Sequence, residues 1–163
     1  MLKNVLIKLV FLLGVTLSAY AQKRLPDVFI ENLQRQNVSA TEILNPNGPA
    51  IISFWATWCK PCLRELQAIN AELEEWTKAT NVKLVAISTD DARTQMRVPA
   101  LVKSKKWNFD IYVDPNGDLQ RSMNILSIPY TIILNKNGEI IYQQSAYAPG
   151  DEAKYFEVLK GLE

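Results

Sequence analysis

Histidine is absent from this chain of 163 residues. Its absence excludes Ser-His-Asp and Cys-His hydrolases, acid–base catalysis by imidazole, and most zinc and copper sites. An excess of charge of one sign is also missing, because 18 basic and 17 acidic residues leave a net charge of +1. This balance offers no basic surface for nucleic acid or for an anionic membrane, so neither is expected as a partner.

Long apolar runs are missing beyond the first segment of the chain. That segment has basic Lys3 and Lys8, an almost wholly apolar run at 9–17, and the small-x-small sequence Ala19-Tyr20-Ala21. The pattern predicts a signal peptide at 1–21, cleaved after Ala21, and a mature domain at 22–163 exported to the periplasm. An uncleaved anchor is the alternative, but the run is short for a span of about 20 residues. No stable membrane span is expected after cleavage.

Cysteine is scarce, and the only two stand three positions apart in Trp58-Cys59-Lys60-Pro61-Cys62. The apolar run at 50–56 precedes them as a predicted buried strand, and a helical pattern follows. A helix N-terminus carries partial positive charge that stabilises a thiolate, so this placement predicts a reactive dithiol. Cys59, at the helix start, is the expected attacking thiol, and Cys62, one turn later, is better shielded.

A structural disulfide and a zinc site are the two alternative roles for the cysteine pair. A structural disulfide here would close a ring of about four residues and contribute only about 2 kcal/mol. A zinc site needs further ligands, and the chain offers no other cysteine and no histidine. Redox chemistry without a metal or cofactor is therefore favoured.

The remaining pattern predicts one α/β domain. Strands are expected as a pair within 25–38 and at 50–56, 82–88, 110–113, 130–134 and 139–144; helices at 60–78, 91–106, 118–124 and 150–162, with a helical turn at 41–44. Pro99 is expected to break or restart the second helix, and Thr89 and Asp90 to cap it. Asp90-Asp91 and 103–106 are otherwise interpreted as a cap and a solvated face. The inward positions expected in the last helix are Ala153, Phe156, Val158 and Leu159.

Two motifs resemble the thioredoxin superfamily and, more narrowly, the exported TlpA/ResA-type thiol–disulfide oxidoreductases. They are Phe54-Trp55-Ala56-Thr57-Trp58-Cys59-Lys60-Pro61-Cys62 and Ser127-Ile128-Pro129-Tyr130-Thr131. The resemblance covers most of 25–162. It implies a thioredoxin-like α/β fold, a central mixed sheet flanked by helices, with an N-terminal strand pair and a helix–strand insertion at about 91–113.

The same resemblance assigns roles around the dithiol. It implies that Pro129 is cis and faces the dithiol, leaving the Ile128 backbone free to pair with an extended substrate; the sequence alone would make Pro129 a strand-edge turn. Pro61 suits the first turn of a helix. Lys60 either stabilises the Cys59 thiolate or is merely solvated. Trp58 is expected at the surface as an apolar substrate contact, whereas Trp55, Trp76 and Trp107 are expected to pack inside.

Glu65 follows Cys62 by three residues and so lies about one helical turn further along. The resemblance implies that an acid here lies near the dithiol and takes part in proton transfer; the alternative is a surface acid paired with Arg64 or Lys60. The chain departs from thioredoxin at Ser53, where thioredoxin has a buried Asp. It also has Gln67 where related chains have proline. Any proton relay would then depend on Glu65 or on water.

The resemblance implies a reductase of protein disulfides, with apocytochrome c as a candidate substrate and a membrane thiol as electron donor. An oxidase or isomerase is the nearest alternative, although the DsbA type has a histidine in its CxxC motif. A non-catalytic binding module with a static disulfide is a second alternative. A peroxidase is less favoured because Ala56, not threonine, stands three residues before Cys59. A copper chaperone would use CxxxC and a histidine.

Overall fold

The structure is a computed structural model that describes residues 24–162. The signal peptide expected at 1–21 lies outside these residues. The strands are β1 (Phe29–Asn32), β2 (Asn37–Ser39), β3 (Ala50–Trp55), β4 (Lys83–Ser88), β5 (Asp110–Val113), β6 (Tyr130–Leu134) and β7 (Ile140–Ser145). The helices are α2 (Lys60–Thr80), the short 3-10 helix η1 (Gln95–Arg97), α3 (Val98–Lys105), α4 (Asp118–Ser122) and α5 (Glu152–Lys160).

The seven strands form one mixed sheet in the order β2-β1-β5-β4-β3-β6-β7. Strands β3, β4 and β5 run parallel, whereas β6 and β1 pair antiparallel with β3 and β5, respectively. All six residues of β3 are buried, because it has a neighbouring strand on each side and helices cover the sheet. The predicted mixed sheet flanked by helices is therefore confirmed, including the strand pair β1–β2 and the α3–β5 insertion.

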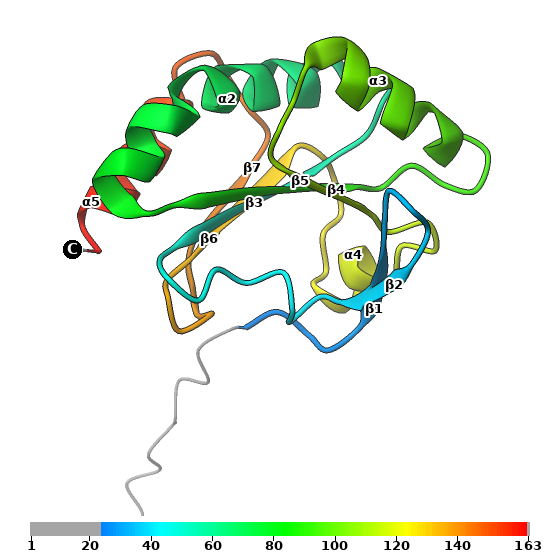
Figure 1. The fold of residues 1–163 in the computed structure, drawn as a ribbon, viewed down its shortest axis with the longest axis horizontal. Helices are drawn as coiled ribbons and strands as arrows, with labels where there is room; N and C mark the ends of the chain where they lie inside the picture. The colour runs from blue at the N-terminus through cyan, green and yellow to red at the C-terminus, as the bar shows by residue number, and fades with distance from the viewer. Residues whose placement is uncertain (1–23, 163) are drawn as a thin grey trace, which may run out of the picture.

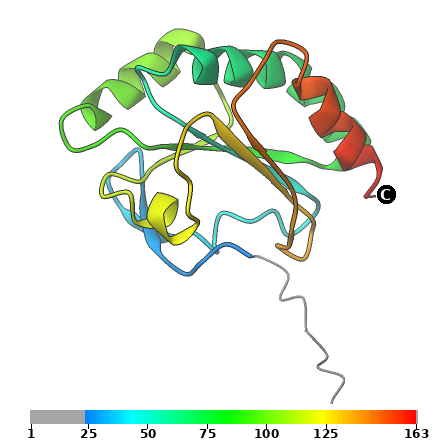
Figure 2. The same ribbon diagram turned by 180° about the vertical axis from the view of Figure 1, so that it is seen from behind.

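Successive side chains of β3 point to opposite faces of the sheet, so they belong to different core clusters. Ile52 and Phe54 pack in a cluster with Leu119 of α4, whereas Ile51 packs with Ile69 of α2 and Leu159 of α5. Helices α2, α3 and α5 lie over one face of the sheet, and α4 lies over the other (Figures 1 and 2). The dithiol thus begins a helix that covers the centre of the sheet.

Helix α2 begins and ends with clear local signals. Cys59 is its N-cap with an extended backbone (φ −86°, ψ 93°), and a proline occupies its first turn. Asn81 ends it in the left-handed conformation (φ 54°), with its N–H donating to Thr77 O. Leu66, Ile69 and Trp76 are buried on the predicted face.

The predicted helices differ from the structure in three details. Helical structure within 91–106 begins only at η1; α3 then starts at Val98 with Pro99 in its first turn, so the expected restart at Pro99 is confirmed. Proline is tolerated there because an N–H in the first turn of a helix has no acceptor within that helix. The stretch at 41–44 forms turns rather than helix. In α5, Ala153 is exposed, and Tyr155, 0% exposed, is the inward side chain.

Candidate active site

The two cysteines form a disulfide where β3 leads into α2. The S–S distance is 1.98 Å, and the two Cα atoms are 5.3 Å apart. The Cys62 N–H donates to Cys59 Sγ at 3.3 Å, so this sulfur occupies the acceptor position of a helix N-cap. Cys59 is 5% exposed and Cys62 is 0% exposed. After reduction, a thiolate at Cys59 would therefore be the more accessible sulfur and would be stabilised by a backbone amide.

The disulfide packs against apolar side chains on its buried side, and the residues next to it in the motif are partly or largely exposed to solvent. Both cysteines pack in a cluster with Trp55 and Leu66, and Ile128 packs against it. Trp58 is 62% exposed. Lys60 is exposed and Pro61 is half-buried. Trp55, Trp76 and Trp107 are buried, as expected from the sequence.

The second motif places a cis peptide bond next to this cluster. The Ile128–Pro129 bond is cis, as the resemblance implied. Pro129 is buried, and its carbonyl accepts a hydrogen bond from Ala146 N–H at 2.9 Å. Ile128 has no main-chain hydrogen-bond partner among residues 24–162. Its N–H and C=O are therefore available to an extended chain laid beside them.

Glu65 is a fully buried carboxyl group held by three hydroxyls. Ser53 Oγ donates to one oxygen at 3.1 Å, and Thr131 Oγ1 and Tyr155 OH donate to the other at 2.8 and 2.7 Å. Burial raises the pKa of Glu65, the three hydrogen bonds oppose that rise, and the charge of Asp151 adds to it. The alternative of a surface acid paired with Arg64 or Lys60 is wrong, because α2 turns Glu65 toward β3, β6 and α5.

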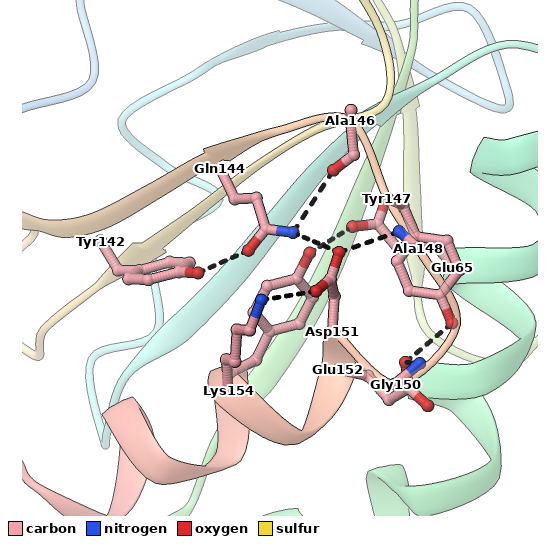
Figure 3. A network of polar contacts seen from close by, with 11 residues as sticks. Glu65, Tyr142, Gln144, Ala146, Tyr147, Ala148, Gly150, Asp151, Glu152 and Lys154 are labelled. Carbon is pink, nitrogen blue, oxygen red and sulfur yellow. Dashed lines mark hydrogen bonds and ion pairs between the residues drawn. The ribbon is translucent and has the colours of Figure 1, made fainter.

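A polar network at the start of α5 lies beside Glu65 (Figure 3). Asp151 accepts hydrogen bonds from Lys154 Nζ at 2.6 Å and from Gln144 Nε2 at 2.8 Å. Lys154 holds the pKa of Asp151 below its usual value. Tyr147 donates to Glu152 at 2.7 Å, and burial together with this bond raises the pKa of Tyr147 to about 12. The acidic residues of this network thus lie near a carboxyl group whose pKa is raised chiefly by burial.

A second buried carboxylate, Asp90, lies just beyond β4. It is 0% exposed and accepts hydrogen bonds from Thr57 N–H at 2.7 Å, Thr57 Oγ1 at 2.6 Å and Ser88 Oγ at 2.7 Å. The prediction that Asp90 caps a helix is wrong, since the loop before Cys59 encloses it. Asp91 instead accepts from the N–H groups of Arg93 and Thr94. The sequence feature that could have indicated a buried Asp90 is Ser88-x-Asp90 at the end of a buried parallel strand.

Within residues 24–162, no group of three His, Cys, Asp or Glu side chains is arranged to hold a metal ion. In the same part of the chain, no helix is both long and apolar enough to cross a bilayer.

Comparison with known proteins connects this geometry to an activity. The AhpC/TSA family matches residues 21–143. Sporulation thiol-disulfide oxidoreductase A of Bacillus subtilis is 30% identical over 129 residues, covering 78% of this chain and 76% of that protein. Thiol-disulfide oxidoreductase ResA of Bacillus thuringiensis is 26% identical over 122 residues, covering 74% of this chain and 67% of that protein.

A solved structure agrees in fold. The solution structure of an uncharacterised thioredoxin-like protein from Porphyromonas gingivalis has a TM-score of 0.77 and 38% identity, covering 85% of this chain and 90% of that one. The dithiol at a helix start, the cis-proline beside it and these relatives agree on one chemistry. The chain belongs to the thioredoxin-like AhpC/TSA family and is a thiol–disulfide oxidoreductase.

Proposed function

We propose that the protein is a reductase of protein disulfides, with Cys59 as attacking thiol and Cys62 as resolving thiol. The Cys59 thiolate attacks one sulfur of a substrate disulfide, forms a mixed disulfide and expels the other sulfur as a thiolate. The Cys62 thiolate then attacks Cys59 Sγ, releases the second substrate thiol and closes the Cys59–Cys62 disulfide. Two electrons pass to the substrate. The observation that carries this proposal is Cys59 Sγ at the N-cap of α2, in a cluster against which Ile128 of the cis Ile128–Pro129 bond packs.

The proposed direction of electron flow rests on how weakly the reduced form is stabilised. An oxidising dithiol owes its potential to a strongly stabilised reduced state. Here one backbone amide, that of Cys62, donates to Cys59 Sγ, and the motif has no histidine to add charge. Exposed Lys60 either adds a modest stabilisation or only faces solvent. The arrangement therefore favours a reductant over an oxidase.

Glu65 is the proposed proton acceptor for Cys62. It lies one turn beyond Cys62 on α2, and its buried carboxyl group has a raised pKa. When ionised, a carboxyl group with a raised pKa is a stronger base than an ordinary carboxylate. It can take the proton from the Cys62 thiol, which must become a thiolate, either directly or through water. Its three partners are hydroxyls, which can donate to a carboxylate or accept from a carboxylic acid.

The substrate is proposed to be an extended protein segment. Ile128 presents unpaired main-chain groups for strand addition. Trp58 and Leu126, the latter 95% exposed, are large apolar side chains that can contact such a segment. The segment 124–131 contains no charged residue, so it favours apolar side chains next to the substrate disulfide.

The cellular setting is proposed from the signal predicted at 1–21. Export would place the domain at 22–163 in the periplasm, with apocytochrome c thiols or other oxidised proteins as substrates. Each turnover oxidises Cys59 and Cys62, so a membrane thiol donor would have to return two electrons. N-terminal sequencing of the exported protein tests the cleavage after Ala21; a chain that still begins at Met1 would contradict it.

Turnover of insulin disulfides with dithiothreitol as electron donor tests the proposed chemistry. Cys59→Ser is expected to abolish turnover, whereas Cys62→Ser should accumulate a mixed disulfide between Cys59 and insulin that is visible by mass spectrometry. Equal turnover of wild type and Cys59→Ser would contradict the assignment. Absence of exchange in the wild type would favour the static binding module.

A further inference from the structure

Hydrogen bonds connect the loop that leads into the dithiol to the end of β4. Thr89 N–H donates to Trp55 O at 2.7 Å, at the point where β3 ends. Two residues later, Thr57 donates to Asp90 through both its N–H and its hydroxyl, at 2.7 and 2.6 Å. These contacts join segments 33 to 34 residues apart in sequence. The path of the chain from β3 to Cys59 therefore depends on the segment 88–90.

Asp90 is the common acceptor of the hydrogen bonds from Thr57 that hold this loop. It is fully buried, both of its carboxylate oxygens are used, and Ser88 adds a third donor. A main-chain N–H moves only with its chain, so its bond to Asp90 fixes the backbone of Thr57. Cys59 N–H in turn donates to Ala56 O at 3.0 Å, which makes 56–59 a turn with Thr57 inside it. Only Trp58 separates the anchored residue from the attacking sulfur.

We propose that Asp90 is a positioning residue that keeps reduced Cys59 at the N-cap of α2, a role that rests on the proposed attack by Cys59. In the oxidised protein, the disulfide itself ties Cys59 to Cys62. Reduction removes this covalent tie. The contacts of the turn 56–59 then hold Cys59 Sγ within reach of the Cys62 N–H, which stabilises the thiolate. Without the Asp90 anchor, the sulfur leaves this position and less thiolate forms at neutral pH.

The pH dependence of Cys59 alkylation tests this role. In the reduced full-length protein, the rate of iodoacetamide addition is measured against pH, and the adduct is located on Cys59 by mass spectrometry. Asp90→Ala is expected to move the midpoint to higher pH and to slow alkylation at pH 7 about fivefold, the effect of losing one helix cap. Rates at high pH should converge. A merely structural role would lower stability but leave the midpoint in place.

Asp90→Asn separates position from charge. The amide keeps an oxygen for Thr57 N–H and Ser88, and its NH2 group can donate to Thr57 Oγ1. The proposal predicts a midpoint close to that of wild type. If the buried negative charge acted instead, its removal would favour the thiolate and lower the midpoint in both the Asn and the Ala variants. That result would overturn the proposal.

Two further variants keep the test decisive. Thr57→Val removes one of the two Thr57 contacts at nearly constant shape, so it should raise the midpoint less than Asp90→Ala does, and it serves if that variant does not fold. Asn135→Ala is the matched control. It breaks hydrogen bonds to the N–H groups of Asn137 and Glu139 at the opposite end of the sheet and should not move the midpoint.

An unchanged midpoint in Asp90→Ala, or in Thr57→Val where the former does not fold, would refute the positioning role. Alkylation needs no substrate, so this result is independent of insulin turnover. Turnover that persists in Cys59→Ser would instead refute the proposed function. The two failures are therefore distinguishable.

Discussion

Glu65 and Asp90 are both fully buried carboxyl groups near one dithiol, yet their partners differ in kind. Glu65 accepts hydrogen bonds from three side-chain hydroxyls. Asp90 accepts from two hydroxyls and from a main-chain N–H of Thr57. A hydroxyl can donate or accept, so the partners of Glu65 suit either protonation state. An N–H can only donate, so the Asp90 contact fixes a position of the backbone.

The different partners of the two acids fit two different roles. Glu65 is suited to gain and lose a proton beside the resolving cysteine, and Asp90 is suited to hold the loop that carries the attacking one. Burial alone distinguishes neither role, because both groups are equally inaccessible. The chemistry of the donors around a buried acid is the more informative feature.

The largest expected effect on stability comes from Asp90→Ala. The change removes the acceptor of the half-buried Thr57 N–H and hydroxyl and of the buried Ser88 hydroxyl, at a cost of about 3 kcal/mol in the free energy of unfolding. Urea unfolding of the oxidised protein measures it. Asn135→Ala, which disrupts an exposed turn, should cost much less. Equal losses for the two variants would mean that Asp90 is no more than an ordinary turn residue.

Glu65→Gln is expected to slow resolution of the mixed disulfide about tenfold to a hundredfold and to flatten its pH dependence, because the proton acceptor is lost. Single-turnover mixing of the reduced variant with a disulfide substrate, quenched with acid, gives the rate. Asp90→Asn is the matched carboxyl-to-amide control and should leave this step unchanged. Equal slowing in both variants would remove the distinction between the two acids.

The stability of the fold should also depend on pH through Glu65. Its folded pKa is raised above the unfolded value of 4.5, so the folded state binds more protons between these two values. Stability from this group is therefore full below pH 4.5 and falls as pH rises through that window, by at most about 1.4 kcal/mol per pH unit. Glu65→Gln should lose this component in urea unfolding at several pH values. A difference between variant and wild type that does not change with pH would contradict it.

Tyr155→Phe should have a smaller effect. It removes one hydrogen bond to Glu65, at a cost of about 1 kcal/mol in unfolding free energy. Because that bond opposes the effect of burial, its loss should raise the pKa of Glu65 further. Carboxyl titration by NMR measures the shift. A lower pKa in the variant would show that the hydroxyl does not stabilise the carboxylate.

Asp151→Asn should produce the smallest change. The Asp151 charge contributes to the raised pKa of Glu65 but is the last of its causes, after burial and the hydrogen bonds. Its removal should lower the pKa of Glu65 slightly in the same titration. A rise in the pKa of Glu65 would contradict the contribution of the Asp151 charge.

Local patterns predicted most of the fold. Strand β3 and helix α2 have strong apolar periodicity, and Pro61 and Cys59 mark the helix start, so their bounds differ little from those expected. In helix α5, Leu159 is buried and Phe156 and Val158 pack against the same cluster, as predicted, but Ala153 is exposed and the buried Tyr155 was not predicted. Its burial depends on Glu65, 90 residues away in sequence.

The dithiol and its neighbours were also visible in the sequence, and the resemblance implied a role for Glu65, but the hydrogen-bond partners of the two acids were not visible. The partners of Glu65 lie 12, 66 and 90 residues away, on three separate elements. Asp90 resembled a helix cap because Asp residues commonly cap helices, and only the arrangement of β3 beside β4 encloses it. Such contacts arise from tertiary packing, which local patterns do not contain.

The reduction potential of the Cys59–Cys62 pair, measured at pH 7 by equilibration with glutathione and then with dithiothreitol, tests the proposed reductase most directly. A value close to that of thioredoxin, about −270 mV, is the predicted result and would make the protein a reductant that needs a supply of electrons. A value near about −120 mV would contradict it and identify an oxidant.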